Sequence, residues 1–214
     1  MMVSPYALYE DYITMDEDNL KMEIACLRQK IASLERKVKA NYQNEIICPN
    51  YDVQLYMTRE YLEKAILACR ELGYEFSYTK KEQRRIDFLE GLTSLKEIKL
   101  EIETFAKWRE THVLTFLSEE VQYDYEYSVI GGKDEKSRTI LDKTDVLAIL
   151  EEIYIEEWKR RYFKPVLDGE SWSCAMCFTD KRAKNYYGTN DYPTTFKKLL
   201  RNLANWRERE KYEK

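Results

Sequence analysis

A seam of hydrophobic residues runs through positions 20–38, near the start of the chain. Apolar side chains recur there in alternating steps of four and three, at Leu20, Ile24, Leu27, Ile31, Leu34 and Val38. Such alternation is the heptad repeat of a left-handed coiled coil. The β-branched residues occupy one of the two heptad core positions and the leucines occupy the other, a division that favours a parallel dimer.

Charged residues beside the seam support the same interpretation. In a parallel dimer they would face residues of opposite sign on the second copy, in the pairs Asp16 with Lys21, Glu23 with Arg28, and Lys30 with Glu35. Exposed pairs of this kind select orientation and partner more than they add stability. We therefore expect an N-terminal coiled-coil helix over residues 1–42 that forms a parallel homodimer. The alternative is that the seam packs on the rest of its own chain, because an isolated helix of this length is marginal.

The next segment, residues 43–95, combines a linker with helices. Turn-forming and polar residues up to position 56 indicate the linker. The spacing of apolar residues predicts helices over 57–72 and 80–95, and a capping box at Thr79 marks the start of the second one.

The hydrophobic period changes to two after residue 95. Alternation of apolar and polar residues predicts strands over 98–102, 111–117 and 121–129, a helix over 143–162, two further strands over 172–179 and 185–187, and a final helix from Pro193. The order is β-β-β-α-β-β-α. Short connections favour an antiparallel sheet with helices on one face, so residues 96–214 are predicted to form an α+β domain.

The composition indicates a highly charged surface and no membrane-spanning segment. Charged residues make up 35% of the chain, and no apolar run approaches the ~18 residues that a membrane span needs. The five cysteines are an odd, scattered set, and no secretion signal precedes them. We therefore expect reduced thiols and a cytoplasmic location.

The net charge of −4 hides an uneven distribution. Residues 110–157 hold 13 acidic and 4 basic residues, whereas residues 181–214 hold 4 acidic and 10 basic residues. We expect the acids of the middle region to form a negative surface that binds a basic protein, including one with a groove for nucleic acid. The candidate partner-binding residues are Glu119, Glu120, Asp124, Glu126, Glu151, Glu152 and Glu156. A solvated surface that keeps the protein in solution is the alternative.

Residues suited to catalysis or metal binding are scarce. His112 is the only histidine, and no P-loop, dinucleotide-binding or nucleophile-elbow motif occurs. Cys174 and Cys177 lie three positions apart on a predicted strand, so their side chains point to opposite faces and cannot close on one zinc ion. We therefore expect no enzymatic activity, no metal and no cofactor.

Two other functions stay open. A nucleic-acid-binding accessory protein could use the basic residues of the last helix, which are Lys197, Lys198, Arg201, Arg207, Arg209, Lys211 and Lys214. Because glutamates interleave with these residues, a solvated terminal helix is the simpler interpretation. A metal-dependent nuclease could be drawn from Asp87, Glu97 and Lys99, although charge alternation on an exposed strand gives the same pattern.

Aromatic and turn-forming residues between positions 158 and 203 form a module. They follow the pattern W-x3-Y, L-D-G-x2-W and Y-x-G-T-N-D-Y-P-x2-F-x2-L-L, in which the matching residues are Trp158, Tyr162, Asp168, Gly169, Trp172, Gly188, Asn190, Tyr192, Pro193 and Phe196. This pattern resembles a C-terminal module of small proteins from Firmicutes, their phages and other mobile elements. The resemblance implies a fold unit and a source, and the matching residues look like turn formers and core anchors.

A small acidic dimer of mobile-element origin is similar to the inhibitors that such elements carry against host defence, of which anti-CRISPR proteins are one class. The resemblance therefore implies an inhibitor that blocks a nucleic-acid-binding effector. The expected partners are a second copy of the chain and a basic protein, with no membrane.

Overall fold

The chain folds into two compact units, Met1–Tyr78 and Thr79–Lys214. The computed structural model describes residues 4–40, 48–105, 107–166 and 169–209. The division falls between Tyr78 and Thr79, whereas the sequence placed the start of the α+β domain at residue 96. The helix over residues 80–92 therefore belongs with the sheet rather than with the preceding helices.

The described residues of the first unit form three helices, α1 (Pro5–Tyr12), α2 (Glu17–Lys39) and α3 (Tyr51–Glu71). Each begins after a residue whose side-chain oxygen accepts a backbone N–H of the first turn; these capping residues are Ser4, Asp16 and Asn50. Helix α3 starts six residues earlier than predicted, because Asn50 ends the linker as a cap.

The hydrophobic seam of α2 is buried inside this unit. Leu20, Ile24, Leu27, Ile31 and Leu34 are all buried, and Val38 is half-buried. The apolar residues of α3 that join the same cluster are Leu62, Ala65, Ala68 and Cys69. The two helices are antiparallel, because Glu35 of α2 lies 2.8 Å from Arg59 while Tyr74, just after α3, bonds to the carbonyl of Met15, just before α2.

The charges beside the seam also find partners within the chain. Lys21 pairs with Glu17 at 2.7 Å, and Arg28 donates to the carbonyl oxygen of Ser77 at 3.0 Å. A parallel dimer through the same six residues would have to displace α3. The structure therefore assigns the seam to the core of this unit, which is the alternative that the sequence left open. Closing a short linker costs less entropy than associating two molecules, so α3 supplies the apolar cover that a second copy was expected to supply.

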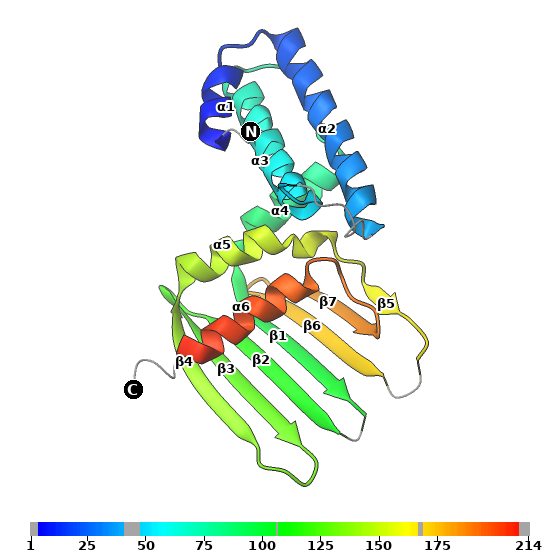
Figure 1. Cartoon of the computed structure of the whole chain (residues 1–214). Helices are drawn as coiled ribbons and strands as arrows, with labels where there is room; N and C mark the ends of the chain where they lie inside the picture. Colours follow the sequence, from blue (N-terminus) through cyan, green and yellow to red (C-terminus); the bar gives the residue numbers. More distant parts are fainter. Residues whose placement is uncertain (1–3, 41–47, 106, 167–168, 210–214) are drawn as a thin grey trace. The chain divides into compact units, whose positions relative to one another are not determined.

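The second unit is an α+β fold built on one mixed sheet of seven strands. The strands are β1 (Leu95–Thr104), β2 (Trp108–Phe116), β3 (Glu120–Val129), β4 (Glu135–Asp142), β5 (Arg161–Phe163), β6 (Glu170–Phe178) and β7 (Ala183–Thr189). The helices are α4 (Lys80–Leu92), α5 (Lys143–Ile153), the short 3₁₀ helix η1 (Ile155–Glu157) and α6 (Phe196–Arg209). The spatial order is β4-β3-β2-β1-β6-β7-β5, and only the β5–β7 pair is parallel (Figure 1).

The predicted order β-β-β-α-β-β-α omitted two strands, β4 and β5. Strand β4 is an edge strand with a largely polar sequence, so it lacks the apolar alternation of a half-buried strand. The predicted helix over 143–162 ends at Ile153, because Tyr154 adopts a left-handed conformation with φ of 53°. This turn releases the chain early enough for β5 to form.

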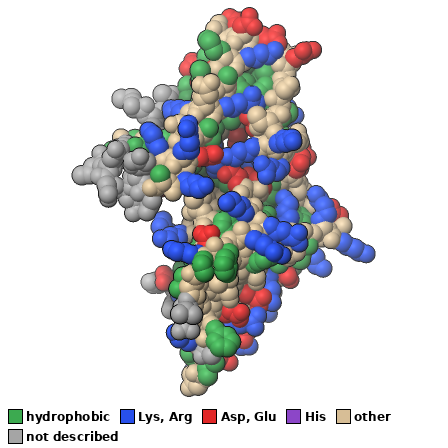
Figure 2. All heavy atoms as spheres, turned by 90° about the vertical axis from the view of Figure 1, so that its right-hand side faces the viewer, with side chains coloured by type: hydrophobic (Ala, Val, Ile, Leu, Met, Phe, Trp, Pro, Cys, Tyr) green, Lys and Arg blue, Asp and Glu red, His purple; other side chains and the backbone are tan. Residues whose placement is uncertain are grey.

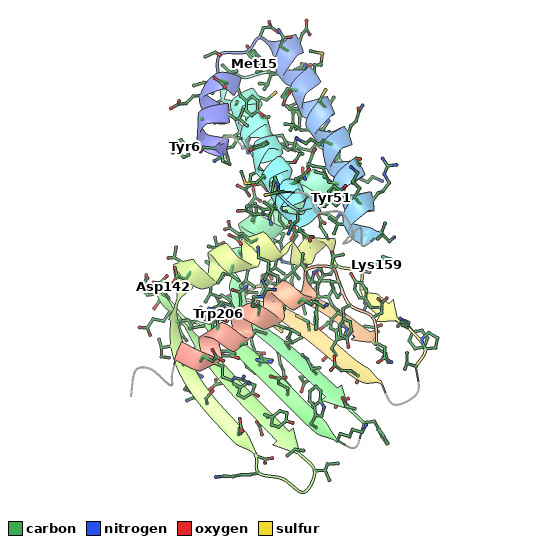
Figure 3. The ribbon with its side chains drawn as sticks, viewed as in Figure 1. Tyr6, Met15, Tyr51, Asp142, Lys159 and Trp206 are labelled. Atoms are coloured by element: carbon green, nitrogen blue, oxygen red, sulfur yellow. The ribbon has the colours of Figure 1, made fainter. Side chains whose placement is uncertain are left out.

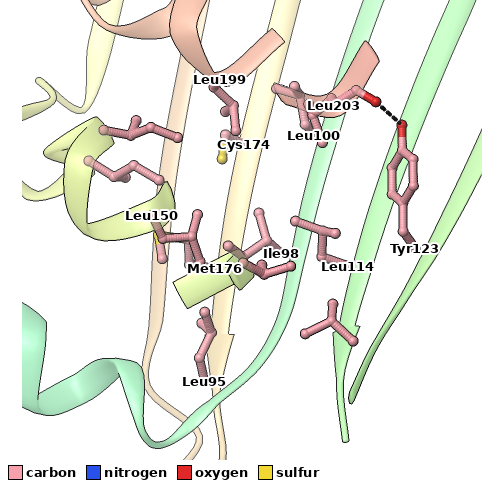
Figure 4. Close-up of a cluster of buried hydrophobic side chains, with 14 of the residues drawn as sticks. Leu95, Ile98, Leu100, Leu114, Tyr123, Leu150, Cys174, Met176, Leu199 and Leu203 are labelled. Atoms are coloured by element: carbon pink, nitrogen blue, oxygen red, sulfur yellow. Dashed lines mark hydrogen bonds between the residues drawn. The ribbon is translucent and has the colours of Figure 1, made fainter. Parts of the chain in front are cut away.

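The core of the second unit lies on one face of the sheet, which we call the covered face. Helices α5 and α6 pack there, as Figure 1 shows, and α4 contributes Phe88 and Leu92. Figure 4 shows the contributing strand residues Ile98, Leu100, Leu114 and Met176 beside Leu150, Leu199 and Leu203 of the helices. The residues that alternate with them line the other face, which we call the open face. No helix of this unit packs on the open face in the described part of the chain.

The aromatic residues of the C-terminal module are core anchors, as predicted. The ring of Trp172 lies 4.7 Å from Phe196, 5.9 Å from Trp158 and 5.8 Å from Tyr162. Asn190 has the positive φ expected of a turn former, and its side-chain oxygen accepts the backbone N–H of Glu170. Asp168 of the same module lies outside the described residues.

Candidate protein-binding surface

The structure separates the seven predicted partner-binding acids into three places. Glu119 lies in the turn between β2 and β3 and Glu120 is the first residue of β3, while Asp124 and Glu126 point from β3 to the open face. Of the remaining three, Glu151 and Glu152 lie in the last turn of α5, and Glu156 lies in η1, which follows it. They do not form one continuous negative face, because Asp124 and Glu126 lie on the open face of the sheet, whereas Glu151, Glu152 and Glu156 belong to helices.

The two acids of the open face are neutralised by strand β4. Arg138 Nε lies 2.5 Å from Asp124 Oδ1, and Lys136 Nζ lies 2.9 Å from Glu126 Oε1. Each acid is directly opposite its partner in the β3–β4 register. Cross-strand pairs of opposite charge stabilise a sheet. Asp124 and Glu126 therefore stabilise the pairing of the edge strand β4 with β3.

Two of the three acids near α5 are also engaged. Glu152 Oε2 lies 2.7 Å from Lys198 Nζ of α6. The side chain of Glu156 is only 3% exposed and lies 3.3 Å from Arg85 of α4. Burial raises the pKa of Glu156, and the nearby Arg85 guanidinium opposes that rise. Glu156 thus holds helices together rather than facing a partner, which corrects its predicted role, while Glu151 remains exposed.

Four acids gather where strands β3 and β4 meet the start of α5. We call this group the acidic corner; its members are Glu119, Glu120, Asp142 and Asp145. Glu120 lies directly opposite Asp142 in the β3–β4 register. Asp142, labelled in Figure 3, caps α5 by accepting the backbone N–H of Asp145 at 3.0 Å. All four residues are exposed.

The acidic corner keeps its negative charge. Like charges directly opposite each other destabilise a sheet. The nearest lysine in sequence, Lys143, is occupied by two carbonyl oxygens, those of Leu117 at 2.8 Å and Ser118 at 3.1 Å. Within residues 4–40, 48–105, 107–166 and 169–209, the four acids of the corner form no ion pair. The corner therefore presents a local negative potential that cations or basic proteins would experience.

A second polar group, which the sequence did not reveal, is enclosed beneath the end of α6. His112 is 4% exposed, and its Nδ1 lies 2.8 Å from the hydroxyl of Tyr123. That hydroxyl donates to the carbonyl oxygen of Leu203, as the dashed line in Figure 4 shows. On its other side, His112 Nε2 lies 3.3 Å from Glu110 Oε1.

Arginine 207 completes this enclosed group from α6. Arg207 donates to the hydroxyl of Tyr125 at 2.8 Å and lies 3.9 Å from Glu110. Contact with His112, followed by the charge of Arg207, holds the pKa of Glu110 below its usual range. Burial raises the pKa of Tyr123, so its hydroxyl stays protonated. Glu110 and His112 are two positions apart on β2, and this spacing was the sequence signal that both side chains lie on one face of the sheet. They lie on the covered face, where His112 is in register with Tyr125 of β3. The group contacts α6 through Leu203 and Arg207, and we call these contacts the clamp on α6.

The cysteine pair is arranged as predicted. Cys174 is buried on the covered face and Cys177 lies on the open face. Burial raises the pKa of Cys174 to about 12, so its thiol stays protonated near neutral pH. In the described ranges, no group of three or more His, Cys, Asp or Glu residues is placed to hold a metal ion.

The basic residues of the last helix do not form a continuous stripe. Lys198 is paired with Glu152, and Arg207 belongs to the enclosed group under α6. Lys197 and Arg201 are exposed, whereas Lys211 and Lys214 lie outside the described residues. The predicted nucleic-acid-binding helix therefore reduces to two exposed bases that the structure can place.

Comparison of the chain with protein families, with curated proteins and with solved structures finds no match. In the part of the chain that the structure describes, no helix combines the length and the apolar character needed to cross a bilayer.

Proposed function

We propose that this chain is a non-catalytic protein-binding protein that holds a basic partner through the acidic corner. The concrete version is an inhibitor that occupies the basic groove of a nucleic-acid-binding effector, as the resemblance of its C-terminal module to mobile-element proteins suggests. The ends of β3 and β4 and the start of α5 present the four carboxylates, and a positive groove of the partner supplies the missing countercharge.

The single observation that carries this proposal is the position of Glu120 opposite another acid, Asp142. Asp142 has a structural reason to be acidic, because it caps α5, and Asp145 lies where the helix dipole favours an acid. Glu120 has no such reason: it faces Asp142 across the strand pair. An exposed like-charge pair that costs stability is the kind of feature that binding to another molecule explains.

The enclosed groups favour a binding role over catalysis. His112 is shielded from solvent, so it cannot meet a substrate as a general base without opening of the sheet unit. The buried thiol of Cys174 has a raised pKa and therefore lacks thiolate character. Both side chains are accounted for by packing and by the clamp on α6.

The test compares capture by the wild-type chain with capture by a charge-reversed corner, Glu119→Lys with Glu120→Lys. Each protein is immobilised and exposed to a nuclease-treated bacterial lysate, and bound proteins are quantified by mass spectrometry. We expect a basic protein that the wild type recovers at low salt and that the variant recovers at least about tenfold less. A lysine at position 120 faces Asp142 favourably, so the variant should fold.

The matched control is Asp134→Lys with Glu135→Lys, which makes the same charge change at the other end of the β3–β4 hairpin. This control should capture the same basic protein as the wild type. Capture that is equal for the corner variant and the wild type would contradict the proposal.

A further inference from the structure

The border of the sheet farthest from the acidic corner is strongly basic. Four cationic residues, Lys159, Arg160, Arg161 and Lys164, fall within six positions that include strand β5 and contain no acid. All four are exposed, and no ion pair to any of them occurs among the residues that the structure describes. We call this group the basic edge. Figure 2, which views the molecule from the β5 side, shows Lys and Arg side chains gathered there beside hydrophobic ones.

Aromatic rings accompany these charges on the open face. Tyr162 points into the core and packs on Trp172, so its neighbours Arg161 and Phe163 are directed to the opposite side. Phe163 is 72% exposed. The guanidinium of Arg161 lies over the ring of Tyr187 on β7, 5.1 Å from its centre. The edge thus carries one exposed ring and a second ring under a cation.

The open-face side chains of the three adjoining strands are small or neutral apart from Arg161. Strands β6 and β7 contribute Ser171, Ser173, Ala175, Cys177, Ala183, Asn185, Tyr187 and Thr189 to this face. Ser171 lies in register with Thr189, which is in turn paired with Phe163, so a shallow strip of short side chains borders the exposed ring. A flat base could lie against this strip on the β7 side, whereas on the β1 side the hydroxyl of Ser171 donates to Glu103 at 3.4 Å and the acids of β1 bound the strip.

We infer that the basic edge and the adjoining open face of β7 and β6 bind single-stranded nucleic acid. Lysine and arginine side chains would contact successive phosphates, and unpaired bases would stack on Phe163 and on the Arg161–Tyr187 pair. An open sheet face that carries aromatic residues, with helices confined to the other face, provides the access that splayed bases need. This inference is independent of the acidic corner, because it uses other residues.

A single strand fits this surface better than a duplex does. In a duplex the bases are stacked on one another, so Phe163 would have no ring to contact and only the phosphate contacts would remain. An acidic protein could pair with the four cations, but it would not explain the exposed ring of Phe163 beside small side chains. These differences make duplex DNA the discriminating probe.

The experiment measures fluorescence anisotropy of labelled DNA and RNA single strands of about 20 nucleotides, and of the matching duplex, with the full chain. We expect both single strands to bind at least about tenfold more tightly than the duplex at low salt. If all four cations engage phosphates, the plot of log Kd against log salt should have a slope of about 3. Reversal of two charges, Arg160→Glu with Lys164→Glu, should reduce that slope to about 1 or less and weaken binding at least about tenfold.

Loss of the exposed ring tests the stacking contribution separately. Phe163→Ser should weaken binding of single strands about fivefold or more and leave binding of the duplex unchanged. Its matched control is Tyr6→Ser, which removes a ring that is 73% exposed on α1 of the first unit and should have no effect. If the β5 variants prove misfolded by circular dichroism, Asn185→Glu adds a negative charge to the same face from β7 and should weaken binding in the same way.

Three outcomes would overturn the inference. The first is absence of single-strand binding by the wild type at about 50 mM salt. The second is binding of the duplex as tight as that of the single strands. The third is equal weakening by Lys197→Glu with Arg201→Glu, which would move the binding site to α6. None of these results depends on whether the acidic corner captures a protein, so the two proposals can fail separately.

Discussion

The acidic corner and the basic edge lie at the two borders of one sheet, and they differ from the strands between them. Six strand spacings of about 4.8 Å separate β4 from β5, or about 29 Å, which exceeds the screening length of about 8 Å at physiological salt. Figure 3 shows the labelled residues Asp142 and Lys159 on these opposite sides. Each surface therefore acts on an approaching molecule without cancelling the other.

Several charges along the strands have partners on the same face of the sheet, in contrast to those of the acidic corner and the basic edge. Asp124 faces Arg138, and Glu101 lies 3.1 Å from Lys99 and 2.5 Å from Arg109. Residues 79–214 hold 26 acidic and 26 basic residues, so the charges of the sheet unit sum to zero although its two borders carry opposite charges. We assign the paired charges to the fold, and the charges of the acidic corner and the basic edge to other molecules.

The largest expected effect on stability comes from a substitution that disturbs the packing next to the basic edge and does not touch the acidic corner. In Gly188→Ala on β7, the added carbon would lie 2.6 Å from Trp172 Cε2 and 2.7 Å from the carbonyl oxygen of Asp191. We expect a loss of about 3 kcal/mol in the free energy of unfolding, because the methyl group overpacks the site and disturbs the bond from Trp172 Nε1 to Asp191. Calorimetry should show a fall in Tm of about 10 °C for the sheet unit.

Gly91→Ala is the control for this substitution. Its added carbon meets only Phe178, at an ordinary contact distance of 3.7 Å, and alanine favours the helix. If the two borders are independent, Gly188→Ala should weaken oligonucleotide binding and leave protein capture by the acidic corner intact. An unchanged Tm in Gly188→Ala would contradict the packing described for this border.

A smaller effect on stability comes from Glu110, which lies near His112 and Arg207, whereas the acids of the acidic corner have no such neighbours among the described residues. Glu110→Gln should lower the free energy of unfolding by about 1–2 kcal/mol at pH 7, because it removes the carboxylate that His112 and Arg207 approach. The pKa of Glu110 is lowered in the folded chain from 4.5. Its contribution is therefore complete above the unfolded value and is lost as the pH falls through the folded value.

Urea denaturation at a series of pH values between 7 and about 3 measures this difference. The gap between wild type and Glu110→Gln should close below about pH 4.5. Glu119→Gln, an exposed acid of the corner, should show no comparable gap at any pH. A gap for Glu110→Gln that stays constant with pH would show that the loss comes from packing rather than from the carboxylate charge.

The smallest effect has the opposite sign and concerns the corner itself. Glu120→Gln should raise the free energy of unfolding by about 0.5 kcal/mol at low salt, because it relieves repulsion from Asp142. The gain should vanish at about 0.5 M salt, where exposed charges are screened. Glu119→Gln carries the same charge change without facing Asp142 and should gain less. Destabilisation by Glu120→Gln would remove the observation on which the proposed function rests.

Periodicity identified which residues of α2 are buried but could not identify what buries them. The alternation of four and three from Leu20 to Leu34 satisfies a parallel dimer and an antiparallel hairpin equally, because both present one apolar stripe. The small residues Ala65 and Ala68 of α3 were the signal for close packing within the chain. The homodimer thus stays a prediction. Most of the seam residues through which it was expected to form are buried against α3 in the structure.

Strand alternation predicted the central sheet well and its borders poorly. The pattern from Val121 to Val129 gave β3 correctly, because one of its faces is buried. Strand β4 carries Lys136 and Arg138 outward at an edge, and β5 spans only three residues, so neither has a hydrophobic pattern. Both borders therefore escaped prediction, and these are the places where we locate binding.

The predicted binding residues illustrate a related limit of sequence reasoning. Net charge along the chain identified the acidic middle, and Glu119 and Glu120 remain in the corner. The identity of their neighbours depended on the β3–β4 register, which brings Asp142 opposite Glu120. Cross-strand neutralisation of Asp124 by Arg138 depended on the same register. A count of charges in a window cannot distinguish these two outcomes.

The brevity of β5 has a kinetic consequence. This strand is joined to β7 through three residue pairs on one side, whereas β1 is paired along its length with both β2 and β6. Amide hydrogens of residues 161–163 should therefore exchange with deuterium through local openings that leave the central strands protected. A bound oligonucleotide would slow exchange at this rim first, so deuterium uptake there would reveal occupancy even when the rest of the sheet remained silent.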